Sequence, residues 1–168
     1  GKTAQLPVHA LLGGAIVDKV PVYANAWDSP PQTPEAIAAR CARMCAEGHR
    51  AVKIYPLRQP TLAGAEACMR LTREAVGPDV DIMLDFAVQR DPRRALRAAR
   101  LFEPYDPYWI EEPLAGDDPK ALAEFRTATT ARITTGERQA GLRHFRQLLD
   151  SRAADVFNPD IAGAGGLL

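Results

Sequence analysis

The sequence predicts an α/β fold, specifically an incomplete TIM-type (β/α) barrel segment with about six parallel strands and outer helices. Six short apolar segments each precede a stretch with helical periodicity. The segments are almost continuously apolar, which is typical of parallel strands covered on both faces. Asp85, Glu111 and Glu137 close the third, fourth and fifth segments at equal intervals. A repeating unit of one strand and one helix, with an acid at the strand end, therefore organises the chain.

The six expected strands alternate with longer amphipathic stretches. In order they are VPVYA at 20–24, AVKIY at 51–55, VDIMLD at 80–85, YWIE at 108–111, ITTGE at 133–137 and ADVFN at 154–158. A doubly wound sheet is the alternative, but it usually places its ligand beside a glycine-rich loop at one switch point. The chain contains no GxGxxG or Walker sequence, so the barrel is favoured.

Capping residues followed by proline mark where helices begin. Thr33 with Pro34, Asp91 with Pro92, and Asp118 with Pro119 each supply this pattern. The first of these helices is expected to end at Gly48. The side chains expected to face the sheet are Ile37, Cys41, Met44 and Cys45 in the first helix, Leu122 and Phe125 in a later one, and Phe145, Leu148 and Leu149 in the last.

Two parts of the chain are expected, a linker helix over residues 1–18 and a partial barrel over residues 19–168. Six strands do not close an eight-stranded barrel, and AGAGGLL follows the last strand without a complete helix. We therefore expect a segment of a longer protein. It would need the missing part of the barrel or another chain to cover its strand edges and apolar helix faces.

Composition excludes several partner classes. The chain is 46% hydrophobic and 25% charged, with zero net charge and a pI of about 7.0. Nothing favours binding to nucleic acid or to an anionic membrane surface, and no apolar run is long enough to span a bilayer. The three cysteines lack CxxC spacing, which is typical of a reducing compartment. We expect a soluble cytoplasmic protein.

The strand-end acids are expected to converge. Side chains alternate along a strand, so Glu111 points into the barrel mouth, and Lys53, Tyr55 and Asp85 point the same way. Because adjacent strands lie about 4.8 Å apart, Asp85, Glu111 and Glu137 can meet. Each pair of carboxylates at 4 Å would repel by roughly 1 to 4 kcal/mol, so a counter-charge is needed.

An all-oxygen site of this kind suits Mg2+, with Mn2+ as a substitute. Zinc is disfavoured because no histidine or cysteine falls at these strand ends. A single strand-end acid more often caps a helix or forms a salt bridge, but three in register favour a metal site. Glu112 has the opposite orientation and is predicted to make a structural salt bridge or a supporting hydrogen bond.

Seven motifs, in order along almost the whole chain, resemble the enolase superfamily, and within it the mandelate racemase and muconate lactonizing enzyme family. They are LLGG at 11–14, VPVYA at 20–24, AVKIY at 51–55, IMLDF at 82–86, WIEEP at 109–113, TTGER at 134–138 and NPDIAGAGG at 158–166. The pattern is most similar to the sugar-acid dehydratase branch, whose relatives include galactonate dehydratases. Residues 1–18 would then be the end of a capping-domain linker helix.

The resemblance implies a role for each matched residue. Asp85, Glu111 and Glu137 would bind Mg2+, which grips the substrate carboxylate and stabilises the enediolate formed when the alpha proton leaves. Lys53 matches the first lysine of the family's KxK pattern and would contact the substrate or the enediolate. The alternative is a strand-end charge that balances the nearby acids. Asp160 matches an aspartate that orients a histidine base from the seventh strand. The chain departs from the family at Tyr55, which replaces the second lysine.

A second departure is Ala87, which replaces an asparagine or a catalytic histidine. Tyr55 would need a lowered pKa to act as a base, whereas a neutral phenol could donate a proton. One-sided proton chemistry favours dehydration of a sugar acid to a 2-keto-3-deoxy acid. The alternatives are a racemase or epimerase of a 2-hydroxy acid, and a non-catalytic metal-binding relative or fragment. The expected partners are a small carboxylate substrate and further copies of the chain in a homo-oligomer.

Overall fold

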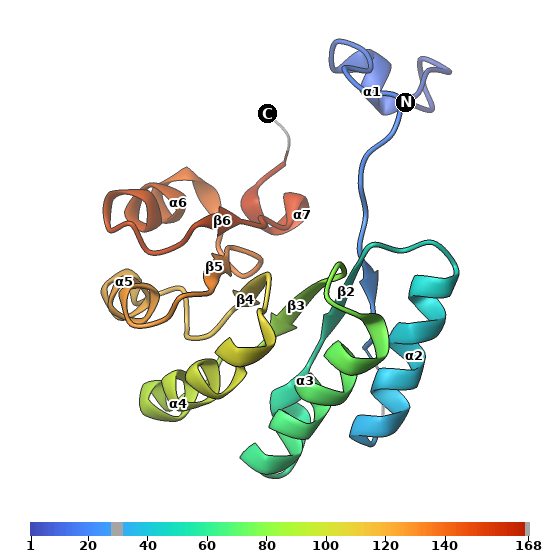
Figure 1. The fold of residues 1–168 in the computed structure, drawn as a ribbon. Coiled ribbons are helices and arrows are strands. Elements are labelled where there is room, and N and C mark those ends of the chain that lie inside the picture. The colour runs from blue at the N-terminus through green and yellow to red at the C-terminus, as the bar shows by residue number, and fades with distance from the viewer. Residues whose placement is uncertain (28–31, 167–168) are drawn as a thin grey trace.

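The computed structural model describes residues 1–27 and 32–166. Six parallel strands form one sheet in the order β1-β2-β3-β4-β5-β6. The strands are β1 (Ala24–Asn25), β2 (Ala51–Ile54), β3 (Asp81–Asp85), β4 (Trp109–Glu111), β5 (Arg132–Thr135) and β6 (Val156–Phe157). This open sheet with its helices confirms the predicted barrel segment of the α/β class (Figure 1).

Helices follow the strands and pack around the outer side of the curved sheet (Figure 1). They are α2 (Pro34–Ala46), α3 (Leu62–Val76), α4 (Pro92–Phe102), α5 (Pro119–Thr127) and α6 (Gly141–Asp150), with short turns η1 (Pro56–Arg58), η2 (Glu103–Tyr105) and α7 (Ile161–Ala164). Within the described ranges, no helix is both long and apolar enough to cross a membrane.

Three predicted helix starts are confirmed by their caps. The Thr33 side chain accepts a hydrogen bond from Ala36 N, and Asp118 accepts one from Ala121 N. Asp91 accepts from the two amides that follow Pro92. Each cap satisfies amides that the first helical turn leaves without a partner.

The predicted inward face of the last helix is wrong at one position. Leu148 is fully buried, but Leu149 is 60% exposed. Successive helical residues point about 100° apart, so the side chain after Leu148 turns away from the sheet. Phe145 does pack against the core, as expected.

Every observed strand differs from its expected bounds by one or more residues, and the differences at β1 and β5 bear on the site. β1 begins at Ala24, and the preceding Val20 and Val22 are exposed without a neighbouring strand. β5 ends at Thr135 rather than at Glu137. Gly136 adopts a backbone φ of 132°, which residues other than glycine rarely adopt, so the chain leaves the sheet there. Glu137 therefore lies in a loop beyond the strand.

The first twenty-odd residues stand apart from the sheet and its helices (Figure 1). Their only helix is the four-residue α1 (Val8–Leu11), which contains no buried residue. Gly13 and Gly14 follow with positive φ angles and turn the chain away from helical geometry. The assignment of this region to the end of a capping-domain linker stays a prediction.

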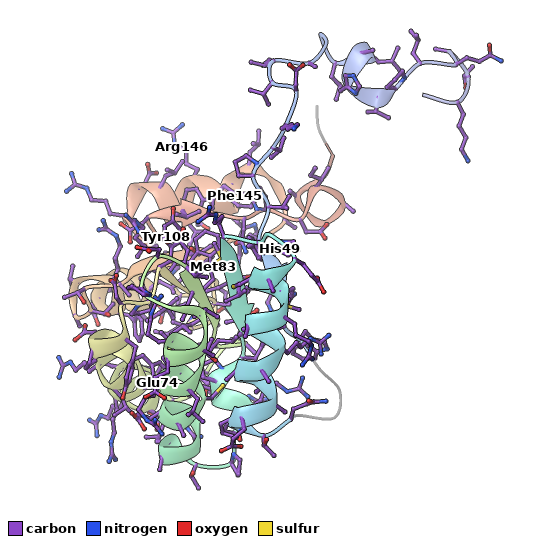
Figure 2. All side chains as sticks on the ribbon, turned by 45° about the vertical axis from the view of Figure 1, so that its right-hand side comes forward. His49, Glu74, Met83, Tyr108, Phe145 and Arg146 are labelled. Atoms are coloured by element: carbon purple, nitrogen blue, oxygen red, sulfur yellow. The ribbon has the colours of Figure 1, made fainter. Side chains whose placement is uncertain are left out.

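The core lies between the sheet and its helices. Ile54, Leu84, Ile110 and Ile133 from four successive strands are completely buried there. Charged side chains instead project from the outer faces of the helices, as Figure 2 shows for Glu74 on α3 and Arg146 on α6. The helices thus cover one face of the sheet and leave the carboxyl ends of the strands to carry polar groups.

Candidate functional site

Strand register brings two of the predicted acids together. Asp85 and Glu111 are direct partners across β3 and β4. Lys53 from β2 reaches both, with its Nζ 2.9 and 3.0 Å from the two Glu111 carboxylate oxygens and 3.6 Å from Asp85 Oδ2. All three side chains are buried, at 6%, 8% and 1% exposure for Lys53, Asp85 and Glu111. We call these three residues the central cluster.

Lys53 and Glu111 stabilise each other's charged form in the central cluster. Burial alone would lower the pKa of Lys53, but the hydrogen bond and the charge of Glu111 outweigh it and raise that pKa, so the ammonium stays charged. Burial raises the pKa of Glu111, while Lys53 acts to lower it. Lys53 therefore supplies much of the counter-charge that these two carboxylates need.

Glu137 lies near the cluster without joining it. Its side chain is 41% exposed, and its Oε1 lies 3.5 Å from Arg138 Nε. Its charge still acts to raise the pKa values of Glu111 and Glu112. In the part of the chain that the structure describes, no three His, Cys, Asp or Glu side chains are grouped closely enough to hold a metal ion.

The chemistry of the donors nevertheless fits a hard divalent ion. Asp85 and Glu111 offer carboxylate oxygens side by side, and Asn158 presents a buried amide oxygen that has no hydrogen-bond partner among the described residues. Oxygen ligands of this kind are those that Mg2+ prefers. The residues that would hold the ion are Asp85, Glu111 and Glu137, which stay a predicted set.

Tyr55 lies beside the cluster in a small aromatic group. Its hydroxyl accepts a hydrogen bond of 3.1 Å from Asn25 Nδ2, and its ring meets Trp27 edge to face. Lys53 Nζ lies 5.7 Å from the Tyr55 ring centroid and 5.6 Å from that of Tyr23. Burial raises the pKa of Tyr55. The side chain is therefore a neutral phenol near pH 7, able to donate a proton rather than take one.

Asp160 is placed at the end of the sheet but away from the central cluster. Its side chain caps α7, where Oδ1 accepts a hydrogen bond of 2.7 Å from Gly163 N. The residue is exposed. Its predicted role as the partner of a histidine stays a prediction, while its capping contact explains its local conformation.

Asn158, two residues earlier, is the site residue that sequence reasoning missed. Its Nδ2 donates a hydrogen bond of 3.0 Å to Glu111 Oε1. The signal was a polar residue at the end of the sixth expected strand, with the same orientation as Asp160. This hydrogen bond connects the central cluster to the residue that directly follows β6.

Glu112 makes the supporting contact expected of it. It is completely buried, and its Oε1 accepts hydrogen bonds from Thr135 Oγ1 at 2.8 Å and from Gly136 N at 2.9 Å. The sequence predicted a structural salt bridge or a supporting hydrogen bond for Glu112, and the structure contains the hydrogen bond. The adjacent glutamates thus make different contacts, Glu111 with Lys53 in the central cluster and Glu112 with the end of β5.

Comparison with known proteins identifies the family. Residues 36–168 match the family model described as "Enolase C-terminal domain-like". The chain is 35% identical to a D-gluconate dehydratase of Thermoproteus tenax over 96% of its own length and 34% of the relative's. It is 33% identical to an L-rhamnonate dehydratase of Saccharopolyspora erythraea, covering 99% of the chain and 42% of that protein.

Solved structures agree with this match. A mandelate racemase/muconate lactonizing enzyme from Jannaschia sp. CCS1 superimposes with a TM-score of 0.86 at 32% identity, covering 98% of the chain and 47% of that structure. The 3,6-anhydro-D-galactonate cycloisomerase from Zobellia galactanivorans gives 0.87 at 29% identity, covering 98% and 45%. The chain thus spans less than half the length of these relatives. It belongs to the enolase superfamily, with the fold of the enolase C-terminal domain and relatives among the sugar-acid dehydratases.

Proposed function

We propose that the protein is a Mg2+-dependent lyase that dehydrates a sugar acid to a 2-keto-3-deoxy acid. The reaction would remove the proton alpha to the carboxylate and expel the hydroxyl beta to it. The observation that carries the proposal is the buried central cluster at the strand ends, in a chain whose relatives include a D-gluconate dehydratase and an L-rhamnonate dehydratase.

Lys53 would bind the substrate carboxylate. Its ammonium is held in its charged form at the carboxyl ends of the strands, where barrel enzymes carry their chemistry. A divalent ion held by Asp85, Glu111 and Glu137 would supply further positive charge against that carboxylate when bound. Once these carboxylates have another counter-charge, Lys53 Nζ could turn from Glu111 to the substrate.

Tyr55 and Asp160 would serve the two proton transfers. Tyr55 Oη carries a proton near pH 7 and would donate it to the departing hydroxyl. Asp160 would orient a histidine base, as the resemblance to the family implies. A neutral phenol where relatives carry a second basic lysine leaves one face of the substrate without a base. This asymmetry favours dehydration over racemisation, which needs proton transfer at both faces.

Racemisation or epimerisation is the second candidate, because a solved structure similar to this chain is named a mandelate racemase/muconate lactonizing enzyme. It would act on a 2-hydroxy acid with the same cluster. Assembly into a homo-oligomer is part of the proposal for either reaction, and light scattering of the full-length protein would measure it.

The test is a screen of the full-length protein with Mg2+ against aldonic and aldaric acids in D2O. We expect a 2-keto-3-deoxy product from at least one acid, and little or none from the Lys53→Met variant. Deuterium in recovered substrate without a keto product would identify an epimerase. A protein that binds Mg2+ but leaves every acid unchanged and undeuterated would contradict both candidates.

A further inference from the structure

Glu112 connects three successive strand ends. Its backbone N donates to Thr134 O at 2.9 Å in β5, and its backbone O accepts from Val88 N at 2.8 Å in the loop after β3. Its side-chain Oε1 accepts hydrogen bonds from Thr135 Oγ1 and Gly136 N. Glu112, which directly follows Glu111, therefore connects the loop after Asp85 to the residues just before Glu137.

Holding Glu112 in this position carries a cost. The carboxylate is completely buried, and its Oε2 has no hydrogen-bond partner in the described part of the chain. The backbone is in the left-handed region at φ 45°, which residues other than glycine adopt rarely. A buried, half-satisfied acid in a strained conformation opposes folding. Such features concentrate where a fold holds a functional group in place.

The side-chain contacts of Glu112 fall on the last residues before Glu137. No larger residue fits at Gly136, since an added Cβ would lie 3.0 Å from Phe145 Cε1. The Gly136 amide donates to Glu112 Oε1, and the next residue in the chain is Glu137. The direction in which Glu137 leaves β5 therefore depends on a hydrogen bond from the adjacent strand.

We propose that Glu112 is a positioning residue that fixes the end of β5, so that Glu137 stays within reach of Asp85 and Glu111. The part of this inference that concerns metal binding rests on the proposed function. The anchoring of Gly136 does not, and it can be measured in the absence of any metal or substrate.

Four variants of the full-length protein separate the side-chain bonds from general packing. Glu112→Ala removes both bonds, whereas Glu112→Gln keeps an oxygen that can accept from the same two donors. Thr135→Val removes one bond and preserves the shape of the side chain. Thr134→Val is the matched control, because the neighbouring hydroxyl is equally buried but has no hydrogen-bond partner among the described residues.

Hydrogen exchange at the Gly136 amide, measured without metal, tests the anchoring. In Glu112→Ala we expect this amide to exchange about tenfold faster or more, since the lost bond was made to a charged acceptor. In Glu112→Gln and Thr134→Val, the Gly136 amide should exchange at the rate of the parent protein. In Thr135→Val, its rate should lie between those of the parent and Glu112→Ala. Unchanged exchange in Glu112→Ala, or equal acceleration in Thr134→Val, would overturn the proposal.

Mn2+ affinity, followed by electron paramagnetic resonance, tests the consequence for Glu137. Loss of a group that supports a metal ligand typically weakens binding by about 10-fold to 100-fold, and we expect this range for Glu112→Ala. Glu112→Gln should restore affinity, whereas an equal loss in both would show that Glu112 acts through its charge and would overturn a positioning role. If Glu112→Ala does not fold, Thr135→Val must show weaker Mn2+ binding than Thr134→Val for the proposal to stand.

Anchoring and metal binding can fail separately. Faster Gly136 exchange in Glu112→Ala with normal Mn2+ affinity would support the anchoring of Gly136 by Glu112. It would contradict the effect of this anchoring on metal binding. A parent protein that binds no Mn2+ would contradict that link and the Mg2+-dependent function alike, while the exchange measurement would still decide the anchoring.

Discussion

The ends of β2, β3 and β4 differ from the ends of β5 and β6 in how their polar residues are held. At the first group, Lys53, Asp85 and Glu111 are buried, and Lys53 pairs with both carboxylates. At the second, Glu137 and Asp160 lie in loops beyond the strands and are partly or largely exposed. Both groups carry residues that the proposed reaction needs, but only the first is assembled by strand pairing.

The difference has a simple physical origin. A residue inside a strand inherits its position and direction from the register of the sheet, which the core fixes. A residue beyond the strand depends on a few individual contacts, such as the bond from Gly136 to Glu112 or the cap from Asp160 to Gly163. Substitutions should therefore destabilise the first group strongly and alter the second mainly in function.

Replacement of Lys53 by methionine should have the largest effect on stability. It leaves Glu111 and Asp85 buried without their counter-charge, so we expect a loss of about 3 to 5 kcal/mol in the free energy of unfolding. Urea unfolding without divalent ions measures it. Arg70→Met is the control, because its ion pair with Glu74 is solvent-exposed and should contribute little to stability. Equal losses in the two variants would contradict a buried ion-pair cluster.

Replacement of Asp160 should separate capping from catalysis. Asp160→Ala should lower the free energy of unfolding by about 1 kcal/mol or less, since it removes one cap from a short exposed helix. Asp160→Asn caps equally well and should leave stability unchanged. If Asp160 orients the base, both variants should lose most dehydratase turnover at normal stability. Full turnover in Asp160→Asn would instead leave Asp160 with a structural role alone.

Removal of the Tyr55 hydroxyl should have a small effect on stability. Tyr55→Phe loses one partly exposed hydrogen bond from Asn25, which contributes about 0.5 to 1 kcal/mol. Its main signature is in pH dependence. Because the folded pKa lies above the ordinary value of 10, the folded protein keeps this proton where the unfolded chain releases it. The contribution of Tyr55 to stability is therefore complete below pH ~10 and falls as the pH rises further.

Ultraviolet absorbance of tyrosinate, compared between the parent protein and Tyr55→Phe, measures this titration. We expect the signal specific to Tyr55 to appear at a higher pH than that of a free tyrosine. Its appearance at neutral pH would mean that Tyr55 is a base after all, and that the two faces of the substrate are treated alike.

Strand repetition and helix caps could be predicted from sequence because each depends on neighbouring residues. The alternation of apolar segments placed Asp85 and Glu111 on one face, and the cap-proline pairs located three helices. The prediction of Glu137 at a strand end failed because Gly136 leaves the sheet first. Asn158 ends the sixth expected strand, but its position alone does not show which distant side chain it contacts, so its bond to Glu111 was not predicted.

The sequence left open whether Lys53 balances the nearby acids or acts on the substrate. Converging acids were expected to require a cation, but the sequence alone could not show that the Lys53 side chain would reach Glu111 and Asp85 at bonding distance. That distance depends on the depth of each residue in the sheet and on the conformation of a long flexible side chain.

The three native thiols lie in α2 and α3, the layer that covers the sheet. Burial raises the pKa values of Cys41 and Cys68 to about 12, and it also raises that of the more accessible Cys45. Thiols react as thiolates, so these three should respond slowly to maleimide reagents near neutral pH. A cysteine introduced at an open position such as Leu142, which is 88% exposed, could then carry a fluorophore without first removing the others.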